Sequence, residues 1–437
     1  MTRCKNNSNS IKMEGGSPLG GSVRIQGSKN AALPIMAACL LIPGKCTLRG
    51  CPDITDVAYM IRLLESTGAG VEVSHTAEGI DISIDAGNIS GCRLPSRYVK
   101  AMRSSVILMG ALLGRTGEAY VDYPGGCVIG ERPIDMHLSG LEKLGAQIWT
   151  EGNRIHAYAD ELAGAQIRLP FSSVGATQNI ILAAATAKGT TVIKNAAREP
   201  EITVLCEFLN KAGAEIILPE SFWTEGRLII KGTPLSKLHA ADFDMIPDRI
   251  VTGTYMFAAM AAGGSVNLEN VPIEQLHSVC AVISKMGGSI TYSPKGKTLK
   301  VSAPENGEIK NIDFIETDVY PGFPTDLQSP LMAAASTAKG SLTIKESIFS
   351  SRFKIAEELR RMGADIVTDG DTAVIKGVAA LLGRNVIAHE LRGGAALVIA
   401  GLAASGITTV SDISYINRGY QDIVGDLRCL GARISYE

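Results

Sequence analysis

The sequence predicts an α/β fold: a two-lobed inside-out α/β barrel made of six repeated αβαβ-type units, three per lobe. Three observations support this prediction. The chain of 437 residues exceeds the roughly 250 to 300 residues at which a single core stops growing, which favours two domains. Hydrophobic residues make up 46% of the chain but aromatic residues only 5%, which is typical of a globular protein built from aliphatic side chains. The third observation is an internal repeat, which decides the architecture.

The first half of each repeat is a nearly all-apolar helix, a glycine and a β-rich strand. A helix without a polar face is expected to be buried. The pattern occurs at residues 31–48, 104–121, 178–193, 253–268, 329–344 and 394–410, with its glycines at Gly44, Gly117, Gly189, Gly264, Gly340 and Gly406.

The second half of each repeat is an amphipathic helix that a glycine separates from a second strand. It occurs at residues 61–73, 138–150, 205–217, 279–291, 355–367 and 424–436, with glycines at Gly68, Gly145, Gly213, Gly287, Gly363 and Gly431. These helices have a polar face for solvent. We therefore expect the strands to form an outer layer around a bundle of inner helices in each lobe.

The second repeat contains an insertion. Its two glycines, Gly117 and Gly145, are 28 residues apart, whereas the spacing in the other repeats is 23 to 25 residues. The extra residues fall in "YPGGCVIGERPIDMH", which contains Cys127. Loops on a rigid scaffold often carry function. Cys127 is therefore either a reactive thiol or, as for many free cysteines, a small buried apolar residue.

Charged and polar residues occur where several apolar helices begin. Lys29 and Asn30 precede the first, Arg103 the second, Asp326 the fifth and Arg392 the sixth. A helix N-terminus carries partial positive charge, so a cation there favours a bound anion such as a phosphate or a carboxylate. The alternatives are solvated side chains for Lys29 and Arg103, a helix cap for Asp326, and surface ion pairs for Arg352 and Arg418.

Composition excludes several classes of protein. The net charge of −2 predicts no nucleic-acid partner. The nine cysteines form no CxxC pair and suggest neither a disulfide framework nor a metal site, which fits the cytoplasm. The N-terminus lacks an apolar signal segment, and the longest apolar runs are too short to span a membrane. No oligomeric state is predicted.

A set of motifs, in order along the chain, identifies a resemblance. The motifs "GSKNAALP", "PGGCVIGERPIDMHLSGLEKLGA", "SVGATQN", "NAAREPEI", "IPDRIVTGTY", "FPTDLQ", "SSRF", "ELRGGAALVIAGL" and "NRGY" together closely resemble the UDP-N-acetylglucosamine 1-carboxyvinyltransferase family. These proteins are enolpyruvyl transferases of peptidoglycan precursor synthesis. The resemblance implies a first lobe at residues 29–246 and a second lobe at residues 1–28 and 247–437.

The resemblance also implies a reaction. The 3-hydroxyl of UDP-N-acetylglucosamine attacks C2 of phosphoenolpyruvate, and phosphate leaves from a tetrahedral intermediate without a metal or an organic cofactor. Cys127 matches the cysteine that protonates C3 or forms a covalent adduct, and Asp326 matches the base that accepts the hydroxyl proton. The residues that match the cations around phosphoenolpyruvate are Lys29, Arg103, Arg132, Arg352, Arg392 and Arg418. Those that match the nucleotide-sugar positions are Asn30, Arg132, Pro133, Ile134, Asp135, Ser173, Val174, Gly175 and Ile348.

Two other functions stay open. The enolpyruvyl transferase of the shikimate pathway shares the fold and the donor but lacks the cysteine loop. A non-catalytic sugar-nucleotide sensor would keep the fold without the chemistry. The sequence also departs from the family pattern at Glu390, where aspartate is usual.

Overall fold

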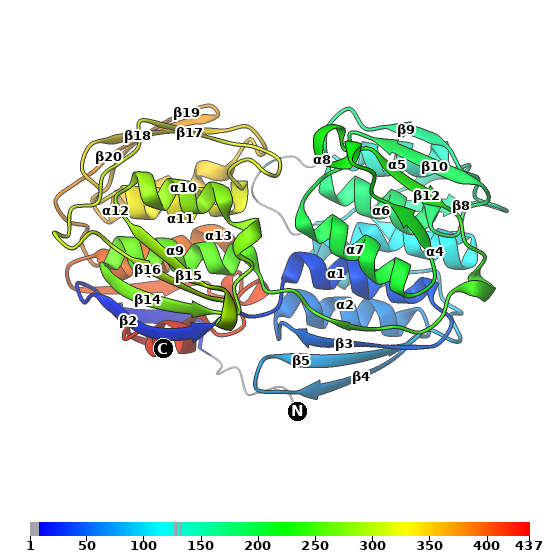
Figure 1. The fold of residues 1–437 in the computed structure, drawn as a ribbon, viewed down its shortest axis with the longest axis horizontal. Helices are drawn as coiled ribbons and strands as arrows, with labels where there is room; N and C mark the ends of the chain where they lie inside the picture. Colours follow the sequence, from blue (N-terminus) through cyan, green and yellow to red (C-terminus); the bar gives the residue numbers. More distant parts are fainter. Residues whose placement is uncertain (1–7, 126–129, 131–132) are drawn as a thin grey trace. The chain divides into compact units, whose positions relative to one another are not determined.

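The chain divides into two compact units. The computed structural model describes residues 8–125, 130 and 133–437 (Figure 1), so Cys127 and Arg132 lie outside the described residues. The first unit consists of residues 27–125 and 133–246, and the second unit consists mainly of residues 8–26 and 247–437. Each unit has its own hydrophobic core.

The apolar helices of the repeats are buried, as the sequence predicts. All residues of α11 and all but the last two residues of α9 are buried. In the second unit α9, α11 and α13 pack against one another, with sheets on opposite sides of α9 and α11 (Figure 1). The buried helices are α1 (Lys29–Ala38), α4 (Leu108–Thr116), α6 (Val174–Ala184), α9 (Arg249–Ala262), α11 (Gln328–Ala335) and α13 (Leu391–Ala403).

The helices of the second half of each repeat are only partly buried. They are α2 (Thr55–Ser66), α5 (Asp135–Lys143), α7 (Pro200–Lys211), α10 (His277–Lys285), α12 (Ile355–Arg361) and α14 (Ile423–Cys429). All twelve glycines predicted to follow the two kinds of helix have φ between 76° and 136°. This left-handed conformation ends a helix with little strain only when the residue is glycine.

The described strands form six small sheets, three in each unit. A four-stranded sheet combines one parallel pair with two antiparallel pairs. The first unit has the orders β13 (Asp242–Asp244)-β3 (Lys45–Cys51)-β5 (Ile80–Asp85)-β4 (Gly70–His75), β6 (Glu118–Asp122)-β8 (Arg154–Tyr158)-β7 (Gln147–Glu151), and β11 (Glu215–Ile217)-β12 (Leu228–Lys231)-β10 (Thr190–Lys194)-β9 (Gln166–Arg168).

The second unit repeats this arrangement with two strands from the N-terminal segment. Its sheets are β21 (Asn385–Ile387)-β22 (Ile407–Ser411)-β1 (Ser10–Glu14)-β23 (Arg433–Tyr436), β15 (Ser289–Ser293)-β16 (Thr298–Ser302)-β14 (Gly264–Glu269)-β2 (Leu19–Arg24), and β17 (Phe314–Thr317)-β18 (Ser341–Glu346)-β20 (Thr372–Lys376)-β19 (Asp365–Asp369). The repeat pattern predicted two strands in each of the six repeats, so the additional strands of each sheet are a finding of the structure.

The chain passes from one unit to the other between Gln26 and Gly27 and again between Ile246 and Pro247. Strand β2 precedes α1 in the sequence but pairs in parallel with β14 of the second unit. Strand β13 precedes α9 but pairs in parallel with β3 of the first unit. Both passages therefore lie directly before a buried helix, and Gln26 is the last residue of the second unit before α1.

Four of the predicted charged residues lie in short 3₁₀ helices. Arg103 begins η2 (Arg103–Ile107), Asp326 lies in η6 (Thr325–Leu327), Arg352 begins η7 (Arg352–Lys354) and Arg418 ends η8 (Ile416–Arg418). The remaining short helices are α3 (Ser96–Ala101), α8 (Ser221–Glu225), η1 (Cys39–Leu41), η3 (Leu235–Lys237), η4 (Ile273–Gln275) and η5 (Pro294–Gly296). Among the described residues, no helix is both long enough and apolar enough to cross a membrane.

Candidate active site

Asp326 in the second unit lies between two arginines. Arg352 Nη2 donates to Asp326 Oδ1 at 2.7 Å, and Arg392 Nη2 donates to Asp326 Oδ2 at 3.1 Å. Both arginine side chains are 3% exposed, whereas the aspartate side chain is 27% exposed. The carboxylate is thus reachable from solvent while its cations are fixed beneath it. Arg352 is therefore not in the surface ion pair that the sequence left open for it.

The charge balance of this cluster keeps both guanidinium groups ionised. Burial works to lower the pKa of Arg352, but the nearby carboxylates of Glu390 and Asp326 outweigh it and raise that pKa. Burial opposes the charge of Arg392 as well, and Asp326 again raises the pKa. Two fixed cations in turn favour the carboxylate form of Asp326, which is the form that can accept a proton.

Ile348 belongs to the same cluster through Glu346. The buried Glu346 carboxylate accepts from Thr325 Oγ1, at 3.0 Å and 2.9 Å to its two oxygens, and from Ile348 N at 2.9 Å. It also accepts from Phe349 N at 3.1 Å, and the Phe349 ring lies 5.5 Å from the Arg352 guanidinium carbon. The loop after β18 is therefore tied to the turn that carries Asp326.

Glu390 and Tyr420 complete the surroundings of Arg392. Glu390 is the N-cap of α13, where it accepts from Arg392 N at 2.8 Å and from Gly393 N. A glutamate can therefore cap α13 at this position. The Tyr420 ring lies 5.6 Å from the Arg392 guanidinium carbon, and Arg418 lies two residues before it in η8.

In the first unit, Lys29 pairs with a carboxylate that the sequence did not single out. Lys29 Nζ lies 2.6 Å from Asp56 Oδ2, and the two side chains are 11% and 1% exposed. Lys29 begins α1, with Ser28 as N-cap, and Asp56 lies in the first turn of α2. Lys29 is therefore not a solvated side chain. The half-buried Asn30 follows it in the same turn.

Two further helix N-termini of the first unit adjoin one another. Ile134 is buried and precedes Asp135, the first residue of α5, and Ser173 caps α6 by accepting from Ala176 N at 3.3 Å. A Cβ at Gly175 would lie 3.0 Å from the ring of His137 on α5.

Arg103 and a buried polar cluster support the same region. Arg103 Nη2 donates to the Pro133 carbonyl at 3.0 Å, and Pro133 lies directly before Ile134. Asn179 of α6 donates to His137 Nδ1 at 3.1 Å and accepts from Gly110 N at 2.6 Å. The structure thus brings together Pro133, Ile134 and Asp135 with Ser173, Val174 and Gly175 through His137.

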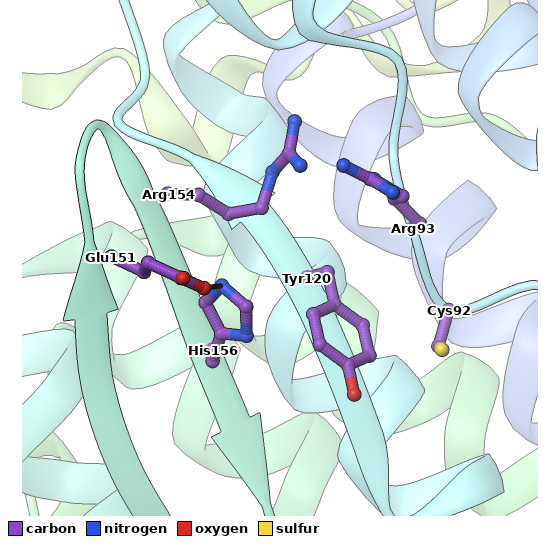
Figure 2. Close-up of a pocket in the computed structure, with 6 residues that line it drawn as sticks. All are labelled: Cys92, Arg93, Tyr120, Glu151, Arg154 and His156. Carbon is purple, nitrogen blue, oxygen red and sulfur yellow. Dashed lines mark ion pairs between the residues drawn. The ribbon is translucent and has the colours of Figure 1, made fainter.

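A separate hollow lies on the sheet β6-β8-β7. It has a volume of about 550 Å³ and is lined by Cys92, Arg93, Tyr120, Glu151, Arg154 and His156 (Figure 2). Arg154 is paired with Asp122 at 2.9 Å, and His156 Nε2 lies 3.4 Å from Glu151. None of the predicted site residues lines this hollow, so it is distinct from both clusters described above.

Sequence reasoning missed Asp56, Glu346, His137 and Asn179. Asp56 and Glu346 carried a usable signal, since each is an acidic residue at a position that the apolar pattern predicts to be buried. Buried charges are usually paired. His137 and Asn179 act through contacts between different helices, which no spacing along the chain encodes.

Comparison with known proteins places this fold in one class of protein. The sequence model of the EPSP synthase (3-phosphoshikimate 1-carboxyvinyltransferase) family matches residues 13–427. The structure resembles that of the enolpyruvyl transferase NikO from Streptomyces tendae, with a TM-score of 0.85 and 24% identity over 98% of this chain and 99% of that one. An EPSP synthase from Acinetobacter baumannii matches with a TM-score of 0.73 and 19% identity over 98% and 99% of the two chains.

The chain therefore belongs to the enolpyruvyl transferase family, and its mixed α/β fold with six small sheets is the fold of that family. Within the family, its similarity is to UDP-N-acetylglucosamine 1-carboxyvinyltransferases. UDP-N-acetylglucosamine 1-carboxyvinyltransferase 1 from Symbiobacterium thermophilum is 46% identical over 96% of this chain and 93% of its own length. The one from Rhodospirillum centenum is 43% identical over 97% of each chain.

Proposed function

We propose that the protein transfers the enolpyruvyl group of phosphoenolpyruvate to the 3-hydroxyl of UDP-N-acetylglucosamine and releases phosphate. The identity of 46% to a relative of that name carries the choice of acceptor. The observation that carries the chemistry is Asp326, a solvent-accessible carboxylate held by two buried arginines. The product is a precursor of peptidoglycan.

Asp326 is the base in this proposal. It removes the proton of the sugar 3-hydroxyl while that oxygen forms a bond to C2 of phosphoenolpyruvate. Arg352 and Arg392 keep the carboxylate ionised until the proton arrives. An aspartate acting only as a helix cap would accept backbone N–H groups at the start of α11, but the N-cap of α11 is Leu327 and carries no side-chain cap.

Cys127 supplies the matching proton to C3 of phosphoenolpyruvate, which gives a tetrahedral intermediate with a methyl group. Loss of a proton from C3 and cleavage of the bond between C2 and the phosphate oxygen then release phosphate and leave the enolpyruvyl ether. This role for Cys127 rests on the family resemblance of its loop. In the same way, Lys29, Arg103, Arg132 and Arg418 are proposed to stabilise the carboxylate and phosphate charges of the donor. No metal or organic cofactor enters this reaction.

The nucleotide sugar is assigned to the paired N-termini of α5 and α6 in the first unit. Helix N-termini offer free N–H groups and partial positive charge to an anion. Pro133, Ile134, Asp135, Ser173, Val174 and Gly175 lie there, and Asn30 and Ile348 are proposed to contribute from α1 and from the loop after β18. The small Gly175 leaves room beside His137 that a larger residue would fill.

The same proposal includes the finer architecture. The two units are the two lobes, residues 29–246 and residues 1–28 with 247–437, and each is an inside-out barrel of three αβαβ-type repeats. This description is supported by three sheets and one core in each unit. A cytoplasmic location stays a prediction from the cysteine usage.

Phosphate release with two acceptors tests the proposal. With phosphoenolpyruvate and UDP-N-acetylglucosamine, we expect catalytic release of phosphate, and none when either substrate is absent. Shikimate 3-phosphate in place of the nucleotide sugar should give no release above background. If phosphoenolpyruvate releases phosphate with shikimate 3-phosphate but not with the nucleotide sugar, the result would favour the shikimate-pathway enolpyruvyl transferase. No release with either acceptor would favour a sensor without catalysis.

A further inference from the structure

Gln26 is a buried amide at the point where the chain leaves the second unit. Its side chain is 7% exposed, although nothing in the predicted reaction uses it. Its backbone carbonyl accepts from Asp248 N at 2.9 Å, and Asp248 is the N-cap of α9. A buried side-chain amide costs free energy unless its donor and acceptor are satisfied, so the partners of its side chain indicate what it does.

Both ends of the Gln26 side chain bond to the backbone around Tyr420. Gln26 Nε2 donates to the Gly419 carbonyl at 3.1 Å, and Gln26 Oε1 accepts from Gln421 N at 2.8 Å. The two peptide groups flank Tyr420, so one amide fixes the backbone on each side of that residue.

Tyr420 connects the backbone held by Gln26 to the candidate site. Its side chain is 1% exposed, and its hydroxyl lies 2.8 Å from Thr254 Oγ1. Thr254 Oγ1 donates to the Ile250 carbonyl at 2.8 Å, so the tyrosine is the donor toward Thr254. The Tyr420 ring packs against Arg392, which in turn binds Asp326.

Gly419 allows the segment to approach α13 closely. A Cβ at Gly419 would lie 2.8 Å from Leu391 Cδ2 at the start of that helix. The segment is therefore in van der Waals contact with α13 on one side and bonded to Gln26 through its peptide groups. Because packed segments shift as units, loss of the Gln26 bonds is expected to move Tyr420 rather than only loosen it.

We propose that Gln26 is a positioning residue for the Asp326–Arg392 pair, which it orients by clamping the backbone on both sides of Tyr420. Its effect on turnover rests on the proposed function, in which Asp326 is the base. The clamp itself does not depend on that function. Gln26 touches neither Asp326 nor Arg392 in this proposal and acts only through Tyr420.

Gln26→Met is the central test, because methionine has a similar length and removes both hydrogen bonds. Turnover per folded molecule should fall about 10-fold to 100-fold, since a small misplacement of catalytic groups is costly. Hydrogen exchange of the peptide at residues 416–422 should become faster. Gln26→Leu also removes both hydrogen bonds without burying a charge. It should give a loss of similar size and serves if the methionine variant does not fold.

Asn311→Leu is the matched control in the same unit. Asn311 Nδ2 also clamps backbone, donating to the carbonyls of Ala335 and Ala338 at 3.1 Å and of Gly340 at 3.2 Å. This variant should lower the melting temperature while turnover per folded molecule and exchange at residues 416–422 stay within about twofold of wild type, because distant sites act independently.

A double-mutant cycle with Tyr420→Leu tests whether Gln26 acts through Tyr420. If Gln26 acts through Tyr420, Gln26→Met should reduce turnover no further once the tyrosine is absent. Unchanged turnover in Gln26→Met, or an equal reduction in both backgrounds, would overturn the proposal. If wild type itself transfers no enolpyruvyl group, the proposed function fails. The exchange measurement then decides the clamp alone, and unchanged exchange at residues 416–422 overturns it.

Discussion

Asp326 combines two properties that a helix cap does not need: an accessible carboxylate and two buried cationic partners. Asp326→Asn keeps an oxygen that can accept from Arg352 but cannot take a proton. We expect turnover per folded molecule to fall about 100-fold to 10,000-fold. Stability should fall as well, because two buried arginines lose the charge of the carboxylate between them. The matched control is Asp122→Asn, because Asp122 also pairs with an arginine, at 2.9 Å, but lies outside the site. Near-normal turnover in Asp326→Asn would show that another group is the base.

Lys29 has a structural partner and a proposed catalytic role, and the two can be separated. Lys29→Met leaves the Asp56 carboxylate, whose side chain is 1% exposed, without its cation and should cost about 3 to 5 kcal/mol of stability. Adding Asp56→Asn should recover much of this loss in a urea titration. Turnover of the double variant should remain at least about 100-fold below wild type if Lys29 binds the donor. Near-normal turnover with recovered stability would leave Lys29 a counter-ion only.

Cys127 is predicted to react with fosfomycin, an epoxide phosphonate that the family resemblance marks as a mimic of the donor. Most of the competing thiols among the described residues are poorly suited to this reaction. Cys39, Cys51 and Cys206 are buried, and burial raises the pKa of Cys51 and of Cys206 to about 12. Cys92 and Cys280 are half-buried, and burial raises the pKa of each. Cys429 is the one fully exposed cysteine among the described residues, so Cys429→Ser removes the most accessible competitor.

Peptide mass spectrometry of the Cys429→Ser variant checks this prediction. Label should appear first on the peptide that contains Cys127, and faster when UDP-N-acetylglucosamine is present, because the nucleotide sugar is proposed to assemble the site. Label on another cysteine in place of Cys127 would return Cys127 to the role of a small apolar residue. A labelling rate that ignores the nucleotide sugar would contradict only the assembly step.

At the scale of residues, a charged side chain at the start of an apolar helix was an informative signal for candidate site residues. The second unit brings into one cluster four residues that were predicted separately, which are Asp326, Arg392, Arg352 and Ile348. Their partners could not be predicted, because Glu346 and Tyr420 join the cluster through contacts between segments far apart in the sequence.

At the scale of elements, the helices were predictable and the sheets were not. The all-apolar helices and their glycines stand out by composition, and the structure places both where the sequence predicts. Two strands of each four-stranded sheet and one strand of the three-stranded sheet were missed. In the sixth repeat one of the missed strands is β1, which comes from the other end of the chain and pairs with β22 and β23. No local pattern could have assigned it.

Helix α14 carries a pH-dependent element next to the Tyr420 segment. Burial raises the pKa of Asp426 to about 7, and the neighbouring Asp422 adds to the rise, although the hydrogen bond from Tyr255 opposes it. Because the pKa is about 3.9 in the unfolded chain, the folded state holds this proton more tightly. Its contribution to stability is complete below about pH 4 and is lost as the pH rises through about 7.

Asp426→Asn should remove this pH dependence. The asparagine oxygen still accepts from Tyr255, so the variant should be more stable than wild type at about pH 8, by about 1 to 4 kcal/mol. Near pH 4 the two proteins should differ little. Urea unfolding at both pH values checks this, with the exposed Asp369→Asn on β19 as control. A variant that is less stable than wild type at the higher pH would contradict the argument.

At the scale of the whole molecule, the described strands form six small sheets, three in each unit, and the two units carry different groups of charged residues on this frame. The second unit holds an accessible carboxylate between two buried arginines. The first unit holds a lysine at one buried helix and an adjoining pair of helix N-termini. The repeat pattern predicts this frame, whereas the insertion after Gly117 and the charged turns distinguish one repeat from another.

The central claim is that this chain joins phosphoenolpyruvate to the sugar 3-hydroxyl by addition and elimination. Nuclear magnetic resonance of the product formed in deuterium oxide tests it most directly, since C3 must gain a solvent proton before phosphate leaves. We predict a carboxyvinyl ether at the 3-oxygen of UDP-N-acetylglucosamine that carries deuterium on its vinyl carbon, with one phosphate released per ether. A product without deuterium, an ether at another oxygen, or phosphate released without any ether would contradict the account.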